Sequence, residues 1–340
     1  MALGEFELIE AVREAARQAG APPGANLVLG SGDDAAVTRA PGATVTSVDA
    51  LVEGVHFRRP AFPPEAIGRK ALAAALSDLA AMGAEPGEAY VQLGLPDDME
   101  DEEVLALARG LGAAAGRWGI ALAGGDVTRA PALFLALTAV GYVDAPERAV
   151  GRAGARPGDV LAVTGELGGA AAGLMALARP GLAAGLAPEV VDALRARQLD
   201  PEPRLAAGRA LAAVGASAMI DVSDGLAADA AHIAERSGVR AEIEVEAVPA
   251  QPGVAEVAAA AGADPLDLVL AGGEDYELLA ALAPARLGAA VESLARQGIG
   301  LSRVGAVSSG YGTLVRERSG RLRPAPGFDH RRGRVRARAR

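Results

Sequence analysis

The chain has 340 residues, 51% of them hydrophobic and only 3% aromatic, a length comfortable for two domains whose cores are filled by alanine, valine and leucine. The formal net charge of −10 argues against a general nucleic-acid or membrane-surface binder. Cysteine is absent, which excludes disulfides, thiolate metal sites and a cysteine nucleophile. The opening MALGEFELIE has no basic region, and no apolar stretch reaches membrane-span length, so we expect a cytoplasmic protein without a signal peptide.

Short apolar runs alternate with longer alanine-rich amphipathic segments, a pattern typical of a mixed α/β protein. The first half is predicted to contain an opening helix and then, in chain order, strands at Asn26–Leu29 and Ala43–Val48, a helix at Pro64–Met82, a strand at Ala89–Leu95, a helix at Asp101–Trp118, and strands at Ile120–Ala123 and Leu133–Val143. The second half is predicted to contain strands at Val160–Thr164, Ala218–Val222 and Ala241–Val245, and helices that start near Leu167, Pro203, Leu226 and Leu287.

A turn-rich, basic stretch, DAPERAVGRAGARPGD, separates the two halves. The predicted organisation is an N-terminal domain over residues 1–145, a C-terminal domain over residues 146–330 and a basic tail over residues 331–340. The tail, RRGRVRARAR, holds six arginines and no acid, so we expect it to be disordered. Anion binding or RNA tethering is the alternative, and kinetics unchanged by deletion of the tail would argue against it.

Five acidic turns lie after or beside apolar runs: GSGDDAAV with Asp33 and Asp34, SVDALVEGVHF with Asp49, LSDLAAMGA with Asp78, AGGDVT with Asp126, and IDVSDGL with Asp221 and Asp224. Carboxylates near one another repel unless something offsets the repulsion, and Mg²⁺ commonly bridges carboxylates to substrate phosphates. The ordinary alternative for any one turn is an aspartate that caps a helix or forms the turn. Five such turns favour a site for metal and phosphate.

The familiar nucleotide-binding motifs do not explain such a site. Gly30, Gly32 and Ala35 match a dinucleotide fingerprint, but two carboxylates inside the loop would repel a pyrophosphate and another strand follows, so this interpretation is rejected. The only lysine, Lys70, is followed by Ala71, which excludes a P-loop, and the HRD and DFG motifs of protein kinases are absent. Bound ATP would therefore depend on aspartate-held metal, on backbone N–H groups and on arginine.

Several further residues are candidates for that site. Gly124 and Gly125 are candidates for backbone contacts, and Arg152 for a fixed positive charge, its alternative being an exposed linker arginine. In AGGEDYELL, Glu274 and Asp275 would orient a substrate or metal or cap the next segment, whereas Glu277 is expected to be structural. Among the histidines, His56 is expected to face the cleft of Asp49, His232 to pack or lie on the surface, and His330 is ambiguous.

The ordered segments MALGEFELI, GSGDDAAV, DALVEGVHF, GRKALAAALSDLAAMGA, GGDVT, GRAGARPGDVLAVTG, DVSDGL and GGEDYEL resemble the thiamine-monophosphate kinase family over nearly the whole chain, as far as PGFDH. The wider superfamily includes aminoimidazole ribonucleotide synthetase. The resemblance implies its two-domain α/β (α+β type) fold, with N-terminal sheets paired in a dimer barrel and a C-terminal α/β sandwich domain. It also implies a homodimer. The negative net charge is the reason that no nucleic-acid or membrane partner is expected.

The resemblance also implies roles for individual residues. It implies that Mg²⁺ is held at Asp34, Ser47, Val48, Asp49, Asp78, Asp126, Asp221 and Asp224. It implies ATP contacts at Gly125, Asp126, Arg152 and Ser223, substrate contacts at His56, Glu274 and Phe328, and catalytic roles for Asp126, Asp221 and Asp224. One position departs from the family, which commonly has threonine where this chain has Val48. A side-chain ligand is lost there, and only the backbone carbonyl could replace it.

The reaction implied is transfer of phosphate from ATP to thiamine monophosphate, giving thiamine diphosphate and ADP, with several Mg²⁺ ions and no phosphoenzyme. The acceptor is a phosphate oxygen that is already ionised, so no strong general base is needed. The rival activities are another enzyme of the superfamily, such as the aminoimidazole ribonucleotide enzyme, and a catalytically silent nucleotide-binding or scaffolding protein. Absence of cysteine disfavours the selenophosphate and hydrogenase-maturation branches, which resemble enzymes that rely on a reactive cysteine or selenocysteine.

Overall fold

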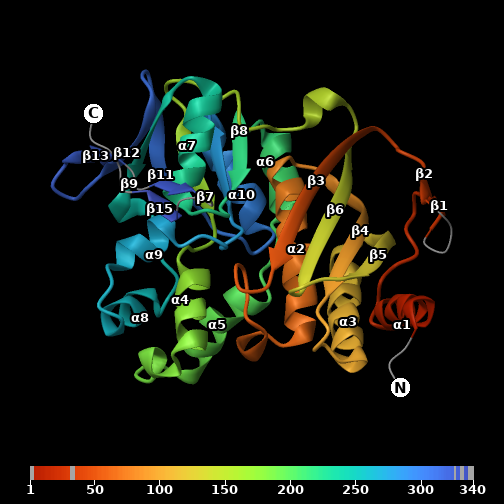
Figure 1. The fold of residues 1–340 in the computed structure, drawn as a ribbon. Helices are drawn as coiled ribbons and strands as arrows, with labels where there is room; N and C mark the ends of the chain where they lie inside the picture. The colour runs from red at the N-terminus through yellow and green to blue at the C-terminus, as the bar shows by residue number, and fades with distance from the viewer. Residues whose placement is uncertain (1–3, 31–34, 325–326, 330–332, 336–340) are drawn as a thin grey trace. The chain divides into compact units, whose positions relative to one another are not determined.

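A computed structural model describes residues 4–30, 35–324, 327–329 and 333–335 (Figure 1). The chain divides into two compact units at residues 148 and 149, and two short segments cross over: Ala80–Gly83 belongs to the second unit and Leu199–Pro201 to the first. The expected two-domain mixture of helices and sheets is confirmed. The exact boundary and the dimer barrel stay predictions. No helix in the described part of the chain is long and apolar enough to cross a membrane.

The first unit builds one four-stranded sheet and three helices. Its elements are α1 (Glu5–Gln18), β1 (Leu27–Leu29), β2 (Val37–Thr38), β3 (Ala43–Val52), α2 (Pro64–Ala81), β4 (Glu85–Leu95), α3 (Asp101–Trp118), β5 (Ala121–Arg129) and β6 (Phe134–Val143), with 3₁₀ turns at Arg59–Ala61 and Pro146–Arg148. The strand order is β3-β6-β4-β5, and β1 pairs separately with β2.

Local sequence explains where the long helices begin and how closely they pack. Helix α3 starts with three acids, which suit the positive end of a helix dipole, and the Glu100 backbone N–H donates to Glu103 Oε2 over 3.0 Å. Gly110 of α3 lies against α2, where an added Cβ would come within 2.1 Å of the Glu65 carbonyl oxygen. Only glycine permits this approach without displacing the α2 backbone.

The two faces of this sheet have different surroundings. On β6, Leu135, Leu137 and Ala139 are buried, whereas the intervening Ala136 and Thr138 are only half-buried. The buried face meets the helices, since a Cβ on Gly141 would lie 3.1 Å from the Leu79 side chain of α2. Because side chains alternate along a strand, the register between strands assigns every residue to the helix-covered face or to the uncovered face.

The second unit is centred on a seven-stranded sheet of order β13-β12-β9-β11-β7-β10-β8. Its strands are β7 (Val160–Thr164), β8 (Ala218–Asp221), β9 (Arg240–Glu244), β10 (Leu278–Leu282), β11 (Leu301–Ser308), β12 (Gly312–Arg316) and β13 (Leu322–Pro324). Its helices are α4 (Gly169–Ala178), α5 (Pro188–Leu199), α6 (Leu205–Val214), α7 (Leu226–Ser237), α8 (Val254–Ala260), α9 (Pro265–Ala271) and α10 (Pro284–Ala295), with 3₁₀ turns at Pro180–Ala183 and Val245–Ala247.

The centre of this sheet is buried on both faces. All residues of β7, β8 and β10 are buried, which explains why these strands are continuous apolar runs in the sequence. Leu279 and Ala281 of β10 join a core with Leu226 and Ile233 of α7. The alternate β10 residues face the other side, where α6 and α10 lie.

A short separate ladder pairs β14 (Gly327–Asp329) with β15 (Gly333–Val335). The second strand falls within the arginine-rich segment for which the sequence predicts disorder. Residues 336–340 of that segment lie outside the described part of the chain.

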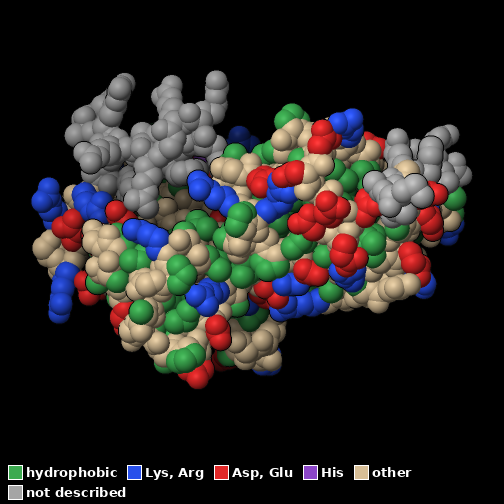
Figure 2. Space-filling model, turned by 60° about the horizontal axis from the view of Figure 1, so that its bottom comes forward, with side chains coloured by type: hydrophobic (Ala, Val, Ile, Leu, Met, Phe, Trp, Pro, Cys, Tyr) green, Lys and Arg blue, Asp and Glu red, His purple; other side chains and the backbone are tan. Residues whose placement is uncertain are grey.

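Surface charge contributes little to this architecture. On the face shown in Figure 2, acidic and basic side chains lie interspersed among apolar ones. Exposed ion pairs such as Arg129–Asp97, 2.6 Å apart, are of a kind that contributes about 0–1 kcal/mol each. The two apolar cores therefore provide most of the stability.

Candidate functional site

The first unit gathers one set of the predicted residues on the helix-covered face of its sheet. Ser47 and Asp49 are opposite Ala139 and Leu137 of β6, which are buried beneath the helices. The Ser47 hydroxyl donates to Asp78 Oδ2 on α2, so the helix brings a second carboxylate to β3. Asp49 itself accepts from the Ala50 N–H over 2.7 Å. Three oxygen-bearing side chains thus share one face.

Asp126 lies on the opposite face of the same sheet. It pairs with Gln92 of β4, whose amide nitrogen donates to Asp126 Oδ2 over 2.7 Å. Gln92 in turn pairs with Ala136 on the uncovered face. Val48 also lies on that face, because it is opposite Thr138, but β6 and β4 separate it from Asp126. Within one chain the structure does not bring Asp126 to Ser47, Asp49 or Asp78.

A cavity of about 730 Å³ adjoins the glycines of the AGGDVT segment. Helix α1, residues 21–30 and strands β4 and β5 line it, mostly with apolar side chains, and Gly125 and Asp126 form part of its wall. Gly125 also has a packing reason to be glycine, since an added Cβ would lie 2.1 Å from the Val91 carbonyl oxygen. A pocket of this size and lining is typical of small-ligand sites.

His56 is held by the turn that follows β3. Its ring Nδ1 accepts from the Val52 N–H over 3.0 Å, and the backbone N–H of His56 donates to the Val52 carbonyl over 2.9 Å. An accepting Nδ1 leaves Nε2 as the nitrogen that carries the proton in the neutral ring. His56 therefore suits a role as a hydrogen-bond donor better than one as a base.

In the second unit, the IDVSDGL segment forms the end of β8 and the turn into α7. Asp221 is buried at the last position of β8, opposite Leu278 of β10, while Ser223 and Asp224 are half-buried in the turn. The expected ATP contact Arg152 is exposed in the loop before β7, where its carbonyl accepts from the Ser237 hydroxyl over 3.1 Å.

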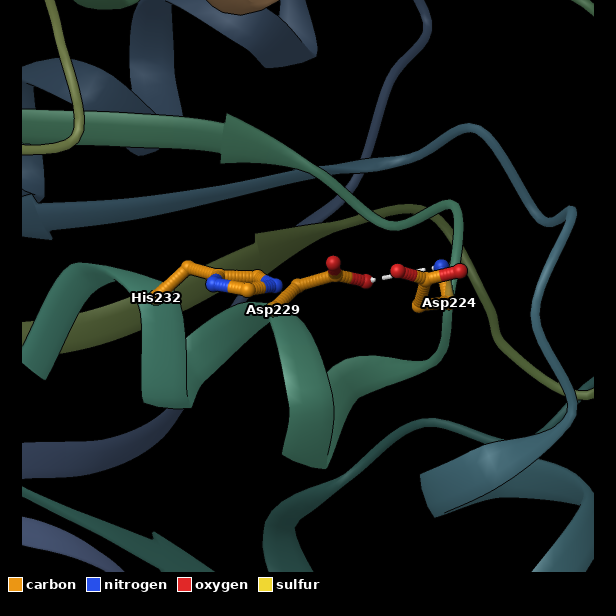
Figure 3. A group of neighbouring side chains, drawn as sticks. All are labelled: Asp224, Asp229 and His232. Atoms are coloured by element: carbon orange, nitrogen blue, oxygen red, sulfur yellow. Dashed lines mark hydrogen bonds between the residues drawn. The ribbon is translucent and has the colours of Figure 1, made fainter. Parts of the chain in front are cut away.

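Asp229 organises this turn and is absent from the sequence prediction. Its Oδ2 accepts from the backbone N–H groups of Ser223, Asp224 and Gly225 over 3.1, 3.2 and 3.1 Å. Figure 3 shows Asp229 between Asp224 and His232, with ligand atoms of the three side chains within 4.8 Å of one another. Burial, and then the charges of Asp221 and Asp224, raise the pKa of Asp229 well above its usual value. An acid in the first turn of α7 is the sequence signal that would have found it.

Replacing Asp229 with alanine is expected to lower the free energy of unfolding by about 3 kcal/mol, because three N–H groups of half-buried or buried residues lose their acceptor. Asparagine keeps an oxygen at this position, so Asp229→Asn should lose about 1 kcal/mol. Urea unfolding of both variants measures the difference. Equal losses would show that the three hydrogen bonds are not what Asp229 contributes.

The GGEDYEL segment lies beside this turn. The Glu274 N–H donates to the Ser223 carbonyl over 2.8 Å, and the Tyr276 N–H donates to the Val222 carbonyl over 2.9 Å. Asp275 is buried and accepts from the N–H groups of Gly168 and Ala170 over 2.7 and 3.0 Å, so it caps the start of α4. Asp275 therefore caps a helix that lies far earlier in the chain, not the segment that follows it. Glu277 is fully buried in ion pairs, as a structural residue would be.

Asp275 gives a pH-dependent prediction. Burial raises its pKa from 3.8 to about 6 against the opposing effects of Arg197 and two N–H donors. The folded state then binds this proton more tightly than the unfolded state, so the contribution to stability is present below pH 4 and lost as the pH rises through 6. Between pH 4 and 7 the wild type should lose about 2 kcal/mol more than Asp275→Asn. Urea unfolding at both pH values tests this, and equal losses would contradict it.

Two predicted residues have side chains outside the described part of the chain. Asp34 lies in residues 31–34, outside the described part of the chain. Phe328 lies in β14, opposite Arg334 of β15, and its side chain is outside the described part. Most of the remaining candidates fall into three groups: the helix-covered face and the uncovered face of the first sheet, and the paired turns of the second unit. His56, in the turn after β3, and Arg152, in the loop before β7, lie outside these groups.

Comparison with known proteins identifies the family. Residues 32–143 match the family described as AIR synthase related protein, N-terminal domain, and residues 156–316 match its C-terminal domain. Thiamine-monophosphate kinase from Mycobacterium tuberculosis is 44% identical over 280 residues, covering 82% of this chain and 80% of the relative. The enzyme of that name from Methanopyrus kandleri is 37% identical, with 92% of each chain covered.

Comparison with solved structures supports the same family. The crystal structure of thiamine-monophosphate kinase from Stenotrophomonas maltophilia matches with a TM-score of 0.80 and 38% identity, over 93% of this chain and 97% of that one. A structure described as AaThiL complexed with AMPPCP and TMP matches with a TM-score of 0.73 and 32% identity, over 94% and 96%. The chain therefore belongs to the AIR synthase related protein family and, within it, to the thiamine-monophosphate kinases.

Proposed function

We propose that this protein transfers the γ-phosphoryl group of ATP to thiamine monophosphate, giving thiamine diphosphate and ADP. The observation that carries the proposal is the match over 94% of the chain to a structure whose name includes both AMPPCP, an ATP analogue, and TMP. The use of ATP also favours a cytoplasmic enzyme.

The donor atoms fit Mg²⁺. Ser47, Asp49 and Asp78 offer only oxygens on one face of β3, and Asp221 and Asp224 offer further carboxylates in the second unit. Hard oxygen donors are what Mg²⁺ selects, and nitrogen or sulfur donors would have pointed to another metal. When bound at these residues, Mg²⁺ would supply positive charge that offsets the repulsion between the two phosphate-bearing substrates.

The chain's own residues would orient the substrates for in-line transfer. A phosphate oxygen of thiamine monophosphate forms the new bond to the γ-phosphorus, and the bond from that phosphorus to the β,γ-bridging oxygen breaks as ADP leaves. The Nε2 proton of His56 would donate to the acceptor phosphate, and Ser223 and Arg152 would contact ATP. Since no residue needs to carry the phosphoryl group, transfer is direct.

The position of Asp126 on the uncovered face of the sheet favours a homodimer. Neighbouring strands are about 4.8 Å apart, so β3 and β5, three spacings apart, are separated by about 14 Å within one sheet. Asp126 also faces the side of the sheet that α2 and α3 leave uncovered. Pairing of this face with that of a second chain would enclose Asp126 and place it in a composite site. Light scattering at micromolar protein concentration tests this, and a monomer with full activity would exclude it.

The decisive assay is purified protein with ATP, Mg²⁺ and thiamine monophosphate, with thiamine diphosphate measured against an EDTA control. Product that depends on metal, with one ADP formed per thiamine diphosphate, supports the proposal. ATP binding without product would indicate another substrate of the superfamily or a silent nucleotide binder. A labelled phosphoprotein on the productive pathway would overturn direct transfer alone.

A further inference from the structure

The backbone that presents Glu274 is strained. Glu274 and Tyr276 have φ angles of 59° and 50°, in the left-handed region that residues other than glycine rarely adopt. Such conformations persist only where the surroundings hold them, and they concentrate at functional sites. The hydrogen bonds of this segment to Ser223 and Val222 fix it against the turn that carries the predicted ATP and metal contacts.

A buried ionic network anchors the end of this segment. Glu277 accepts from Thr164 Oγ1 over 2.6 Å, from Arg197 Nη2 over 2.9 Å and from Arg204 Nη2 over 2.6 Å. Arg197 also donates to the carbonyl of Asp275 over 3.1 Å. The network thereby fixes the backbone that follows Glu274 in the chain, at Asp275 and Glu277.

Gln198, the neighbour of Arg197 on α5, contacts the Glu274 side chain itself. Its Nε2 donates to Glu274 Oε2 over 2.9 Å, and its side chain is 99% buried. Its Oε1 is buried and has no hydrogen-bond partner among the described residues. A buried acceptor without a partner costs stability, and a leucine of similar size would avoid that cost. Stability alone therefore does not explain a glutamine here, whereas orientation of the Glu274 carboxylate does.

We propose that Gln198 is a positioning residue that fixes the Glu274 carboxylate in the orientation that receives thiamine monophosphate. This inference rests on the proposed function. One amide donates to one carboxylate oxygen, so the carboxylate plane is set before the substrate arrives. Preorganisation of this kind improves binding because less freedom is lost when the complex forms.

The test is Gln198→Leu. We expect the KM for thiamine monophosphate to rise about tenfold, the ratio for losing one hydrogen bond to a charged group. The KM for ATP and kcat should stay within about twofold. The melting temperature should not fall, because the loss of the hydrogen bond to Glu274 is offset by removal of the buried Oε1 that has no partner among the described residues. Gln251→Leu is the matched control: Gln251 is also a buried glutamine of the second unit, and no hydrogen bond joins its side chain to Glu274 in the described structure. The KM of Gln251→Leu for thiamine monophosphate should equal that of the wild type.

A double-mutant cycle separates positioning from general packing. If Gln198 acts through Glu274, then Gln198→Leu should not change the KM further in a Glu274→Ala background. An equal rise of KM in both backgrounds, an unchanged KM in the single variant, or a fall in melting temperature together with kcat would each overturn the inference. The wild-type assay separates the two proposals: a wild type without thiamine diphosphate formation removes the proposed function, whereas an active wild type with a normal Gln198→Leu variant removes only this inference.

Discussion

Asp221→Asn is expected to lower kcat for thiamine diphosphate formation about 10³-fold while the protein stays folded. The side chain is 3% exposed at the end of β8, and asparagine has nearly its shape, so the strand pairing opposite Leu278 should survive. What disappears is a negative charge placed where the proposed site holds metal. A metal supplies several kcal/mol of charge stabilisation in such a transition state, and about 4 kcal/mol corresponds to a factor of 10³.

The matched control is Asp159→Asn. Asp159 is a buried aspartate of the same unit, but it accepts from the Arg156 N–H over 2.9 Å and from the Ser217 hydroxyl over 2.6 Å, and neither partner is a predicted site residue. Its substitution should cost stability and leave kcat within about twofold of the wild type. Both variants are measured by steady-state kinetics and by thermal unfolding. An equal loss of kcat in both would mean that loss of folding, not loss of a ligand, is being observed.

Asp126→Asn extends the test to the uncovered face of the first sheet. Its kcat should fall by a similar factor although Asp126 does not lie beside Ser47, Asp49 or Asp78 within one chain. Turnover like that of the wild type in both Asp126→Asn and Asp221→Asn would remove the argument that carboxylates hold catalytic metal.

Glu277→Gln is expected to lower the free energy of unfolding by about 3–5 kcal/mol, the largest effect on stability that we predict. The carboxylate is fully buried and forms ion pairs with Arg197 and Arg204 over 2.9 and 2.6 Å. Glutamine has the same size but no charge, so two largely buried guanidinium groups would remain without their counter-ion. Desolvated charges without a partner are among the most destabilising features that a single substitution creates.

Glu244→Gln provides the comparison for Glu277→Gln. Glu244 forms an ion pair with Arg303 over 2.9 Å in the same unit, but both side chains are at least a third exposed. Loss of such a pair should cost at most about 1 kcal/mol. Urea unfolding of the two variants at neutral pH measures both. A loss below 1 kcal/mol for Glu277→Gln would show that the attraction within the buried ion pairs is offset by the cost of desolvating their charges.

Much of the fold could be predicted because its local signals are strong. The helix predicted at Asp101–Trp118 and the strand at Val160–Thr164 have those bounds in the structure, where an acidic first turn and a continuous apolar run mark them. Three predictions of turns were wrong. Asp78 lies inside α2, in agreement with the helix predicted at Pro64–Met82. Asp49 lies inside β3 and Asp126 inside β5, because long pairing with β6 and β4 extends these strands through residues of low strand propensity.

Other residues of the site carry no local signal. Gln198 and Arg197 act on the GGEDYEL turn from a helix that is distant in sequence: Gln198 is 76 residues from Glu274 and Arg197 is 78 residues from Asp275. A glutamine in a helix looks the same in sequence whether it faces solvent or a buried carboxylate. Only packing distinguishes these cases.

The sequence by itself determined the family, the two-domain α/β composition and the identity of the carboxylate-bearing segments, because ordered motifs and periodic apolar patterns are local properties of the chain. The tertiary structure decided which of those carboxylates share a surface. Strand register places Ser47 and Asp49 on one face of the first sheet and Val48 and Asp126 on the other. A shift of a single residue in register reverses the face of every side chain in a strand, and register is set by pairing between segments far apart in the sequence.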